Sequence, residues 1–283
     1  MHRNARTVSL DTLAGAGPGG GRLIVFASGK GGVGKSNIAL NLGLALAQQN
    51  QRTILLDADF GLANQDILLN FAPPKTTPGS RAVHSSLDER LLTGPIGLRV
   101  LCGVSGTTLD GRVPHFDATA YQRVIEDLRR SADFALVDCG AGVSPAVTSL
   151  ALAADQLVLI TTPEPTALAD VYATLKILVI QGFASRVSVV VNMARSRNEA
   201  EIVGARLARV TQQFLGLNIE LLGHVLLDPH VPAAVRERVP LLLRFPHCSA
   251  SECIRDICEQ FGHLPTESLA RHSTWARVAG LFL

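Results

Sequence analysis

The sequence predicts an α/β fold, with a mostly parallel sheet covered by helices on both faces. Short runs that are apolar throughout alternate with longer segments of helical periodicity. Strands without a polar face must be covered on both sides, and parallel sheets with crossover helices cover them in this way. No repeat or linker interrupts residues 22–262, so we expect one large domain there.

The expected elements follow one another from Leu23 onward. The first helix, Ser36–Gln49, carries an apolar stripe at positions i, i+4, i+7 and i+8, formed by Ile38, Leu42, Ala45 and Leu46. The strands are expected at Leu23–Ala27, Thr53–Leu56, Leu98–Cys102, Phe134–Val137, Gln156–Thr161, Val187–Val191 and Ile219–Val225. The other helices are expected at Ala118–Ser131, Ser144–Ala153, Thr166–Gln181 and Glu199–Leu215.

Three segments do not fit this alternation. Residues 1–21 end in GAGPGGG and are expected to be a flexible lead. Ala72–Ser86 is too rich in Pro, Gly and Ser for regular structure, which indicates a surface excursion. Residues 263–283 form a tail in which a helix would place Trp275, Val278 and Phe282 on one face. Such a helix either binds a membrane reversibly or packs on the domain.

Composition excludes several classes of protein. Hydrophobic residues make up 47% of the chain and charged residues 18%, which excludes a disordered chain. Lys plus Arg number 26 and Asp plus Glu number 24, a balance that argues against a protein that coats nucleic acid. The start MHRNARTVSL lacks an apolar core, and no run reaches the roughly 20 apolar residues of a membrane span. We therefore expect a cytoplasmic location.

The five cysteines are expected to be buried, reduced thiols. No C-x-x-C pair is present, and Cys248, Cys253 and Cys258 lie five residues apart, which scatters them around a helix. A disulfide framework or a thiolate metal site is therefore not expected.

A phosphate-binding loop is expected after the first strand. Residues 29–36, GKGGVGKS, match G-x-x-x-x-G-K-[ST] between a strand and a helix, which predicts a P-loop NTPase domain. Glycines let backbone N–H groups turn toward phosphate oxygens, Lys35 supplies a cation, and the Ser36 hydroxyl ligates Mg²⁺. The expected nucleotide contacts here are Gly29, Gly31, Gly32, Val33, Gly34, Lys35, Ser36 and Asn37.

Carboxylates follow two of the expected strands. Asp57 and Asp59 are spaced i, i+2 after a strand, so both can reach one metal–phosphate centre. The alternative is a turn-forming Asp pair. Asp138 closes an apolar strand in a Walker B arrangement, which places a carboxylate near Mg²⁺, and the Gly140–Gly142 segment after it can act as a switch.

The extra Lys30 makes the loop resemble the deviant Walker A motif of the MinD/ParA family of P-loop ATPases. The resemblance implies ATP-dependent dimers in which Lys30 reaches the partner's nucleotide, as an arginine finger does. It also implies that Asp59 orients the attacking water and that Asp57 helps to hold Mg²⁺ through its waters. An exposed lysine on a mobile loop is the alternative for Lys30.

The resemblance also implies roles for residues in and after the later strands. Glu164 and Asp170, in and after TPEPT, would face the partner subunit, unless this is an ordinary turn with Thr166 as helix cap. Asn192 would bond the adenine edge, although Asn at a strand end is often a turn residue. The Asp228–Pro229 pair would border the base.

Within the family, DADFGLAN and PEPTALADVYA resemble the FlhG branch, also called FleN or YlxH, which limits flagellar number and placement. This implies slow ATP hydrolysis stimulated by partners or membrane, an ATP-bound homodimer, and a membrane-binding tail. FlhF-type GTPases and flagellar switch proteins are the implied partners. The Ser9–Leu13 segment does not reproduce the DQAxxLR-like motif of relatives that stimulate FlhF.

Other functions remain open at this point. A ParA- or MinD-type ATPase would partition DNA or place the division site, and a non-catalytic adaptor would only hold a nucleotide. Nonspecific DNA binding needs a basic patch, which Arg195, Arg197, Arg206 and Arg209 form unless they are a solvated helix face. An iron–sulfur carrier of the same superfamily is disfavoured by the missing C-x-x-C.

Overall fold

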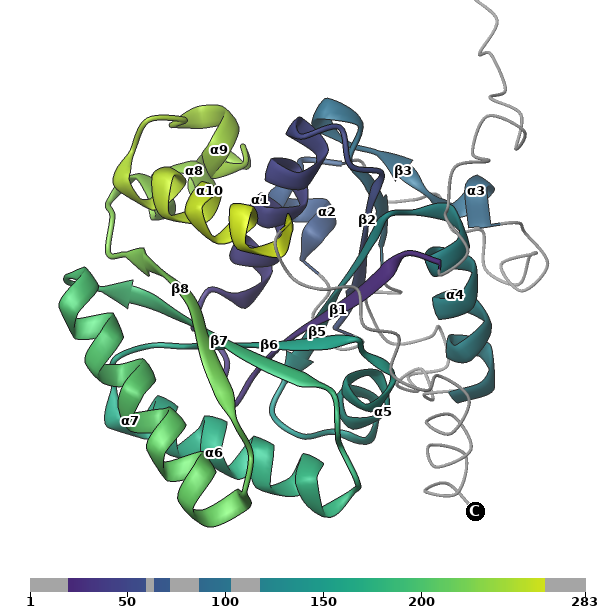
Figure 1. Cartoon of the computed structure of the whole chain (residues 1–283). Coiled ribbons are helices and arrows are strands. Elements are labelled where there is room, and N and C mark those ends of the chain that lie inside the picture. The colour runs from purple at the N-terminus through teal and green to yellow at the C-terminus, as the bar shows by residue number, and fades with distance from the viewer. Residues whose placement is uncertain (1–19, 60–63, 72–86, 103–117, 263–283) are drawn as a thin grey trace, which may run out of the picture.

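A computed structural model describes residues 20–59, 64–71, 87–102 and 118–262 of the chain (Figure 1). Nearly all of the expected flexible lead, the Ala72–Ser86 excursion and the 263–283 tail lie outside the described residues. Their expected roles therefore stay predictions. No helix in the described part of the chain combines the length and apolar character needed to span a membrane.

The described residues form one eight-stranded sheet with the strand order β3-β4-β2-β5-β1-β6-β7-β8. Every neighbouring pair is parallel except β3 and β4, which are antiparallel. The strands are β1 Arg22–Ser28, β2 Thr53–Ala58, β3 Leu92–Thr93, β4 Arg99–Leu101, β5 Phe134–Ala141, β6 Gln156–Thr161, β7 Arg186–Ala194 and β8 Ile219–Leu226. The expected mostly parallel sheet is confirmed.

Helices cover both faces of the sheet, as predicted. One face carries α1 (Lys35–Gln48), α9 (Leu241–Arg244) and α10 (Ser249–Gly262), with α2 (Gln65–Leu68) and α8 (His230–Glu237) beside them (Figure 1). The opposite face carries α4 Ala118–Ser131, α5 Pro145–Ala153, α6 Pro165–Ile180 and α7 Arg197–Leu215. The short α3 (Leu87–Arg90) lies against α4, and a 3₁₀ turn, η2, covers Pro95–Gly97.

Alternation along the central strand β1 creates two separate cores. Leu23, Val25 and Ala27 belong to the core under α4 to α7, whereas Ile24 and Phe26 belong to the core under α1 and α10. All five side chains are fully buried. Burial on both faces explains why the strand reads as a continuous apolar run in the sequence.

Local sequence signals explain where several helices begin and end. The Ser144 and Ser196 hydroxyls cap α5 and α7 by accepting hydrogen bonds from the backbone N–H groups of Val147 and Glu199. Helix α7 ends at Gly216, whose φ of 63° lies in the left-handed region. Two helices beyond the expected ones, α8 and α9, are short and begin next to Pro229 and Pro240, whereas α10 is the helix around which the three late cysteines were expected to scatter.

Charged side chains form ion pairs and hydrogen bonds at the end of the sheet where the parallel strands begin. Arg129 forms an ion pair with Asp155, whose Oδ2 also accepts a 2.8 Å hydrogen bond from the Leu23 N–H. Arg22 donates to the Phe261 carbonyl at 2.7 Å, which anchors the end of α10. These contacts leave the carboxyl ends of the strands as the open edge, where ligands bind in sheets of this kind.

Close packing between α10 and β8 yields a stability test at Gly223. A Cβ added there would lie 2.5 Å from Ile257 Cγ1, too close for a normal contact. We expect Gly223→Ala to lower the free energy of unfolding by about 1–3 kcal/mol through overpacking. Urea denaturation of the single variants Gly223→Ala and Ile257→Ala and of the double variant checks this.

The double variant should lose less stability than the sum of the single losses, with a coupling of at least about 0.5 kcal/mol. Strict additivity would show that the two positions do not compete for space.

Candidate functional site

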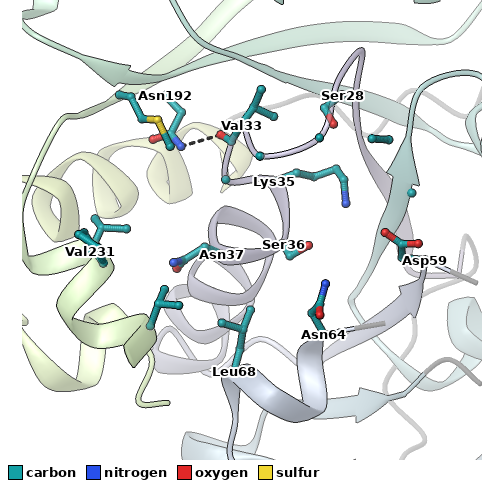
Figure 2. Close-up of a pocket in the computed structure, with 18 of the residues that line it drawn as sticks. Ser28, Val33, Lys35, Ser36, Asn37, Asp59, Asn64, Leu68, Asn192 and Val231 are labelled. Carbon is teal, nitrogen blue, oxygen red and sulfur yellow. Dashed lines mark hydrogen bonds between the residues drawn. The ribbon is translucent and has the colours of Figure 1, made fainter. Parts of the chain in front are cut away.

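A cavity of about 1190 Å³ opens at the carboxyl edge of the sheet (Figure 2). Its walls come from the loop between β1 and α1, from the ends of β2 and β5, and from the segment between β8 and α8. The end of β7 also contributes, so residues in five separate parts of the chain meet around one space. This volume is large enough for a nucleoside triphosphate.

The loop between β1 and α1 has a conformation that only glycine adopts easily. Gly32 and Gly34 have φ values of +80° and +86°, and a Cβ on Gly34 would lie 2.3 Å from Asn192 Nδ2. A Cβ on Gly29 would lie 2.4 Å from the carbonyl carbon of Asp170, so the loop presses against the start of α6. Cβ atoms on Gly31 or Gly32 would meet nothing within 4 Å. The middle of the loop therefore borders open space, where a phosphate fits.

Lys35 is buried in an ion pair with Asp138 at the end of β5. Their side chains are only 7% and 1% exposed. The other Asp138 oxygen, Oδ2, accepts a 2.9 Å hydrogen bond from Gln65 Nε2. The same amide donates to the Ser36 carbonyl at 3.1 Å. Gln65 therefore links Asp138 to the first turn of α1, a role that sequence analysis missed.

Asp57 organises the backbone that follows β2. Its carboxylate accepts hydrogen bonds from the N–H groups of Asp59 at 3.2 Å, Asn64 at 2.9 Å and Gln65 at 3.0 Å. Burial raises the pKa of Asp57 to about 6, although these hydrogen bonds oppose the shift, and the charge of Asp138 adds to it. The side chain is 1% exposed and lies behind the cavity lining. A metal role for Asp57 through water stays a prediction.

Lys30 lies at the rim of the cavity loop and forms an ion pair with Glu164, the residue before α6. The lysine is 32% exposed and the glutamate 63%, so solvent weakens the pair. Helix α6 begins at Pro165 without a side-chain cap, so the alternative in which Thr166 caps it is wrong. Within one chain, Lys30 thus already has an anionic partner.

Asp59 and Ser36 both line the cavity (Figure 2). The Asp59 carboxylate faces Gly140 at the end of β5, where a Cβ would lie 3.5 Å from Asp59 Oδ1. Gly140 and Ala141 also line the cavity, so the segment expected to act as a switch borders it. Asp59 and Ser36 are therefore both open to a ligand in the cavity.

The far end of the cavity has a mixed polar and apolar wall. Asn192 Nδ2 donates a 2.8 Å hydrogen bond to the Val33 carbonyl, which holds the end of β7 against the loop (Figure 2). Asp228 lines the wall, whereas Pro229 does not. Met193 and Val231, which sequence analysis did not name, add apolar surface suited to the face of a base.

The structure brings together most of the predicted nucleotide contacts and leaves a few behind the wall. The cavity is lined by Gly31, Gly32, Val33, Gly34, Lys35, Ser36, Asn37, Asp59, Asn192 and Asp228. Outside its lining lie Gly29, Lys30, Asp57, Asp138, Glu164, Asp170 and Pro229. Asp138 and Asp57 are nevertheless connected to the lining through Lys35 and through the N–H of Asp59.

Comparison with known proteins reveals one family over most of the chain. The ParA profile, described as NUBPL iron-transfer P-loop NTPase, matches residues 21–262. The chain is 34% identical to the antiactivator FleN of Pseudomonas aeruginosa, over 86% of this chain and 87% of FleN. It is 30% identical to the flagellum site-determining protein YlxH of Helicobacter pylori, over 84% of this chain and 81% of that protein.

A solved structure shares the fold. The septum site-determining protein MinD of Pyrococcus horikoshii, in complex with Mg-ADP, superposes with a TM-score of 0.69. The match covers 86% of this chain and 96% of MinD at 23% identity. At that identity the likeness concerns the fold.

The bridging contacts of Gln65 yield a test of the site. We expect Gln65→Met to weaken the binding of ATP in the presence of Mg²⁺ by about tenfold, because Asp138 and the Ser36 carbonyl lose a buried hydrogen-bond donor. Titration with a fluorescent ATP analogue, with Mg²⁺ and with EDTA, measures the effect.

Affinity in EDTA should change much less, since the side chain is fully buried and does not line the cavity. Equal losses with and without Mg²⁺ would instead indicate a general distortion of the loop.

Proposed function

This chain belongs to the ParA/MinD family of P-loop NTPases, and we propose that it is an ATP-driven dimerising switch that regulates flagellar number and placement. One observation carries the switch proposal. Lys35 lies inside the cavity wall, Lys30 lies at its rim, and each forms an ion pair that a phosphate can replace. The likeness to FleN and YlxH over more than four-fifths of the chain supports the flagellar role.

ATP hydrolysis is the reaction that this site supports best. Lys35 leaves Asp138 for the β- and γ-phosphates, and the glycine-rich loop donates backbone N–H groups to them. Ser36, which lines the cavity, would ligate Mg²⁺, with Asp138 and Asp57 behind it. Bound Mg²⁺ supplies positive charge that offsets the charge of the phosphates in the transition state. Asp59, on the cavity wall, would orient the attacking water.

An ATP-bound homodimer fits the surface around the cavity. The rim carries exposed apolar side chains, namely Ile67, Met193, Leu227 and Val235. Apolar groups gathered around a polar cavity are suited to burial by a second protein surface. We propose that the partner covers this rim and that Lys30 exchanges Glu164 for the phosphates across the interface, with Asp170 close to the loop.

Two other functions have less support. Along α7, the exposed Arg197 pairs with Glu201, so acidic groups interrupt the basic residues expected for DNA binding. A non-catalytic adaptor would not need Asp59 at the cavity wall. Iron transfer, which the name of the matched family profile mentions, has no support in this chain, because its five cysteines are free thiols without a C-x-x-C pair.

Regulation is proposed to come from outside the site. Slow turnover would be stimulated by flagellar switch proteins, by an FlhF-type GTPase, or by a membrane that binds the 263–283 tail. In this proposal the monomer is cytoplasmic, and the ATP-bound dimer binds the inner face of the cell membrane. Co-sedimentation of the ATP-bound protein with anionic vesicles tests the membrane step.

A matched pair of variants separates hydrolysis from dimerisation. We expect Asp59→Ala to lower kcat for ATP by about 10²-fold or more, because the water loses its orienting carboxylate, while ATP still drives dimerisation. Lys30→Ala should bind ATP and remain monomeric. Phosphate release and light scattering measure the two effects, and Arg197→Ala, an exposed cation on α7, is the control.

A chain that stays monomeric with ATP and Mg²⁺ would contradict the switch. A single tightly bound nucleotide without turnover, even with partners and lipid present, would favour the adaptor.

The flagellar role is tested in the cell. Deleting the gene should raise the number of flagella per cell or displace them, and electron microscopy counts them. Complementation with Asp59→Ala shows whether hydrolysis is required. Normal flagella together with misplaced septa or lost chromosomes would contradict the flagellar assignment and support the MinD or ParA alternative.

A further inference from the structure

Three metal-binding side chains meet beside the cavity, at the junction of α8 and α10. Asp228 follows β8, His230 begins α8, and Cys248 directly precedes α10. One ligand atom from each lies within 4.8 Å of the others. We propose that Asp228, His230 and Cys248 form a Zn²⁺ site, separate from the Mg²⁺ site at Ser36.

Asp228 is held in place as a metal-ligating carboxylate usually is. Its Oδ1 accepts a 2.9 Å hydrogen bond from the His230 N–H, and its Oδ2 accepts one of 3.1 Å from the Ala250 N–H. The side chain is 6% exposed. Both carboxylate oxygens are therefore held in a fixed orientation, as hydrogen bonds from neighbouring groups hold metal-ligating carboxylates.

His230 and Cys248 lie close to the Asp228 carboxylate, and neither side chain is fully buried. His230 Nδ1 lies 2.7 Å from Asp228 Oδ1, and its ring packs against Phe245 with centroids 4.6 Å apart. The His230 side chain is 48% exposed, so solvent and ions have access. Cys248 is half-buried, and its thiol contacts the Ser251 hydroxyl at 3.3 Å.

The distances suit a small tetrahedral ion after a local adjustment. Zn–O and Zn–N bonds of about 2.1 Å and Zn–S bonds of about 2.3 Å place ligand atoms roughly 3.3–3.7 Å apart. The Nδ1–Oδ1 pair, 2.7 Å apart, must therefore open by about 0.6 Å. The exposed His230 side chain can make this movement. The imidazole would bind through Nδ1 with its proton on Nε2, and the Cys248 thiol would release its proton to solvent.

The ligand types favour Zn²⁺ over Mg²⁺. A thiolate, an imidazole and a carboxylate form a mixed sulfur, nitrogen and oxygen set, whereas Mg²⁺ prefers oxygen ligands alone. Three protein ligands leave a fourth position for water. Cys248 lies 18 residues after His230 and 20 after Asp228, and it is the only cysteine of the three, so C-x-x-C spacing does not indicate this site.

Occupation would join two helices at the wall of the nucleotide cavity. Asp228 lines that wall, and Val231 of α8 lies across the cavity from Asp59 (Figure 2). An ion bound to Cys248 as well would fix the start of α10 to the start of α8. We expect Zn²⁺ to stabilise this C-terminal layer, because it binds the folded site and not the separated ligands.

The test uses the full chain, stripped of metal and nucleotide, with Co²⁺ as the spectroscopic probe and Zn²⁺ as the competitor. One Co²⁺ per chain should produce a sulfur-to-cobalt charge-transfer band that Zn²⁺ abolishes. Cys248→Ser should lose the band, and both Cys248→Ser and His230→Ala should weaken Zn²⁺ binding by at least about tenfold. Cys102→Ser, another half-buried thiol, is the matched control and should keep band and affinity.

Thermal denaturation provides a second readout. Zn²⁺ should raise the Tm of the wild type and of Cys102→Ser, and should not raise that of His230→Ala, whose exposed side chain makes a folding defect avoidable. The proposal is overturned if no charge-transfer band forms, if Cys102→Ser removes it, or if Cys248→Ser and His230→Ala retain wild-type Zn²⁺ affinity. These results do not depend on ATP turnover, so they stand apart from the proposed switch.

Discussion

The buried ion pair between Lys35 and Asp138 is the interaction on which the site depends. It joins the first residue of α1 to Asp138 of β5, and both elements pack mainly in apolar surroundings. Leaving either charge unpaired in the interior would cost several kcal/mol, so Lys35 can leave only when another anion replaces Asp138. A phosphate is such an anion. In the proposed function, nucleotide binding would therefore be an exchange of partners that frees Asp138 to face Mg²⁺.

Hydrogen bonds and a second ion pair connect the loops around the Lys35–Asp138 pair. Asp57 collects three backbone N–H groups after β2, and Gln65 connects that segment to Asp138. Asp138 is thus connected by hydrogen bonds to the segment that carries Asp59. Lys30 and Glu164 form a second ion pair at the surface, where solvent screening makes the pair easier to break. The inner pair suits nucleotide capture, and the outer pair suits contact with a second copy.

The C-terminal layer is connected to the nucleotide cavity by buried polar contacts. Asn41, fully buried in α1, donates to the Asn37 side chain and accepts the Leu242 N–H at 3.0 Å. Asp228 similarly joins the cavity wall to the start of α10. Since buried polar groups are costly to leave unpaired, these contacts connect the cavity wall at Asn37 and Asp228 to α9 and α10.

Sequence by itself determined the parallel sheet, the glycine loop, and the carboxylates toward the carboxyl ends of β2 and β5. These depend on local patterns, because a strand buried on both faces is apolar throughout and a phosphate loop needs glycines at set positions. Only the tertiary structure decided which groups meet. Lys35 and Asp138 are 103 residues apart, and the contacts of Gln65 and the Asp228–His230–Cys248 group leave no periodic signal. Strand order and side-chain direction bring such residues together, and neither is encoded in local spacing.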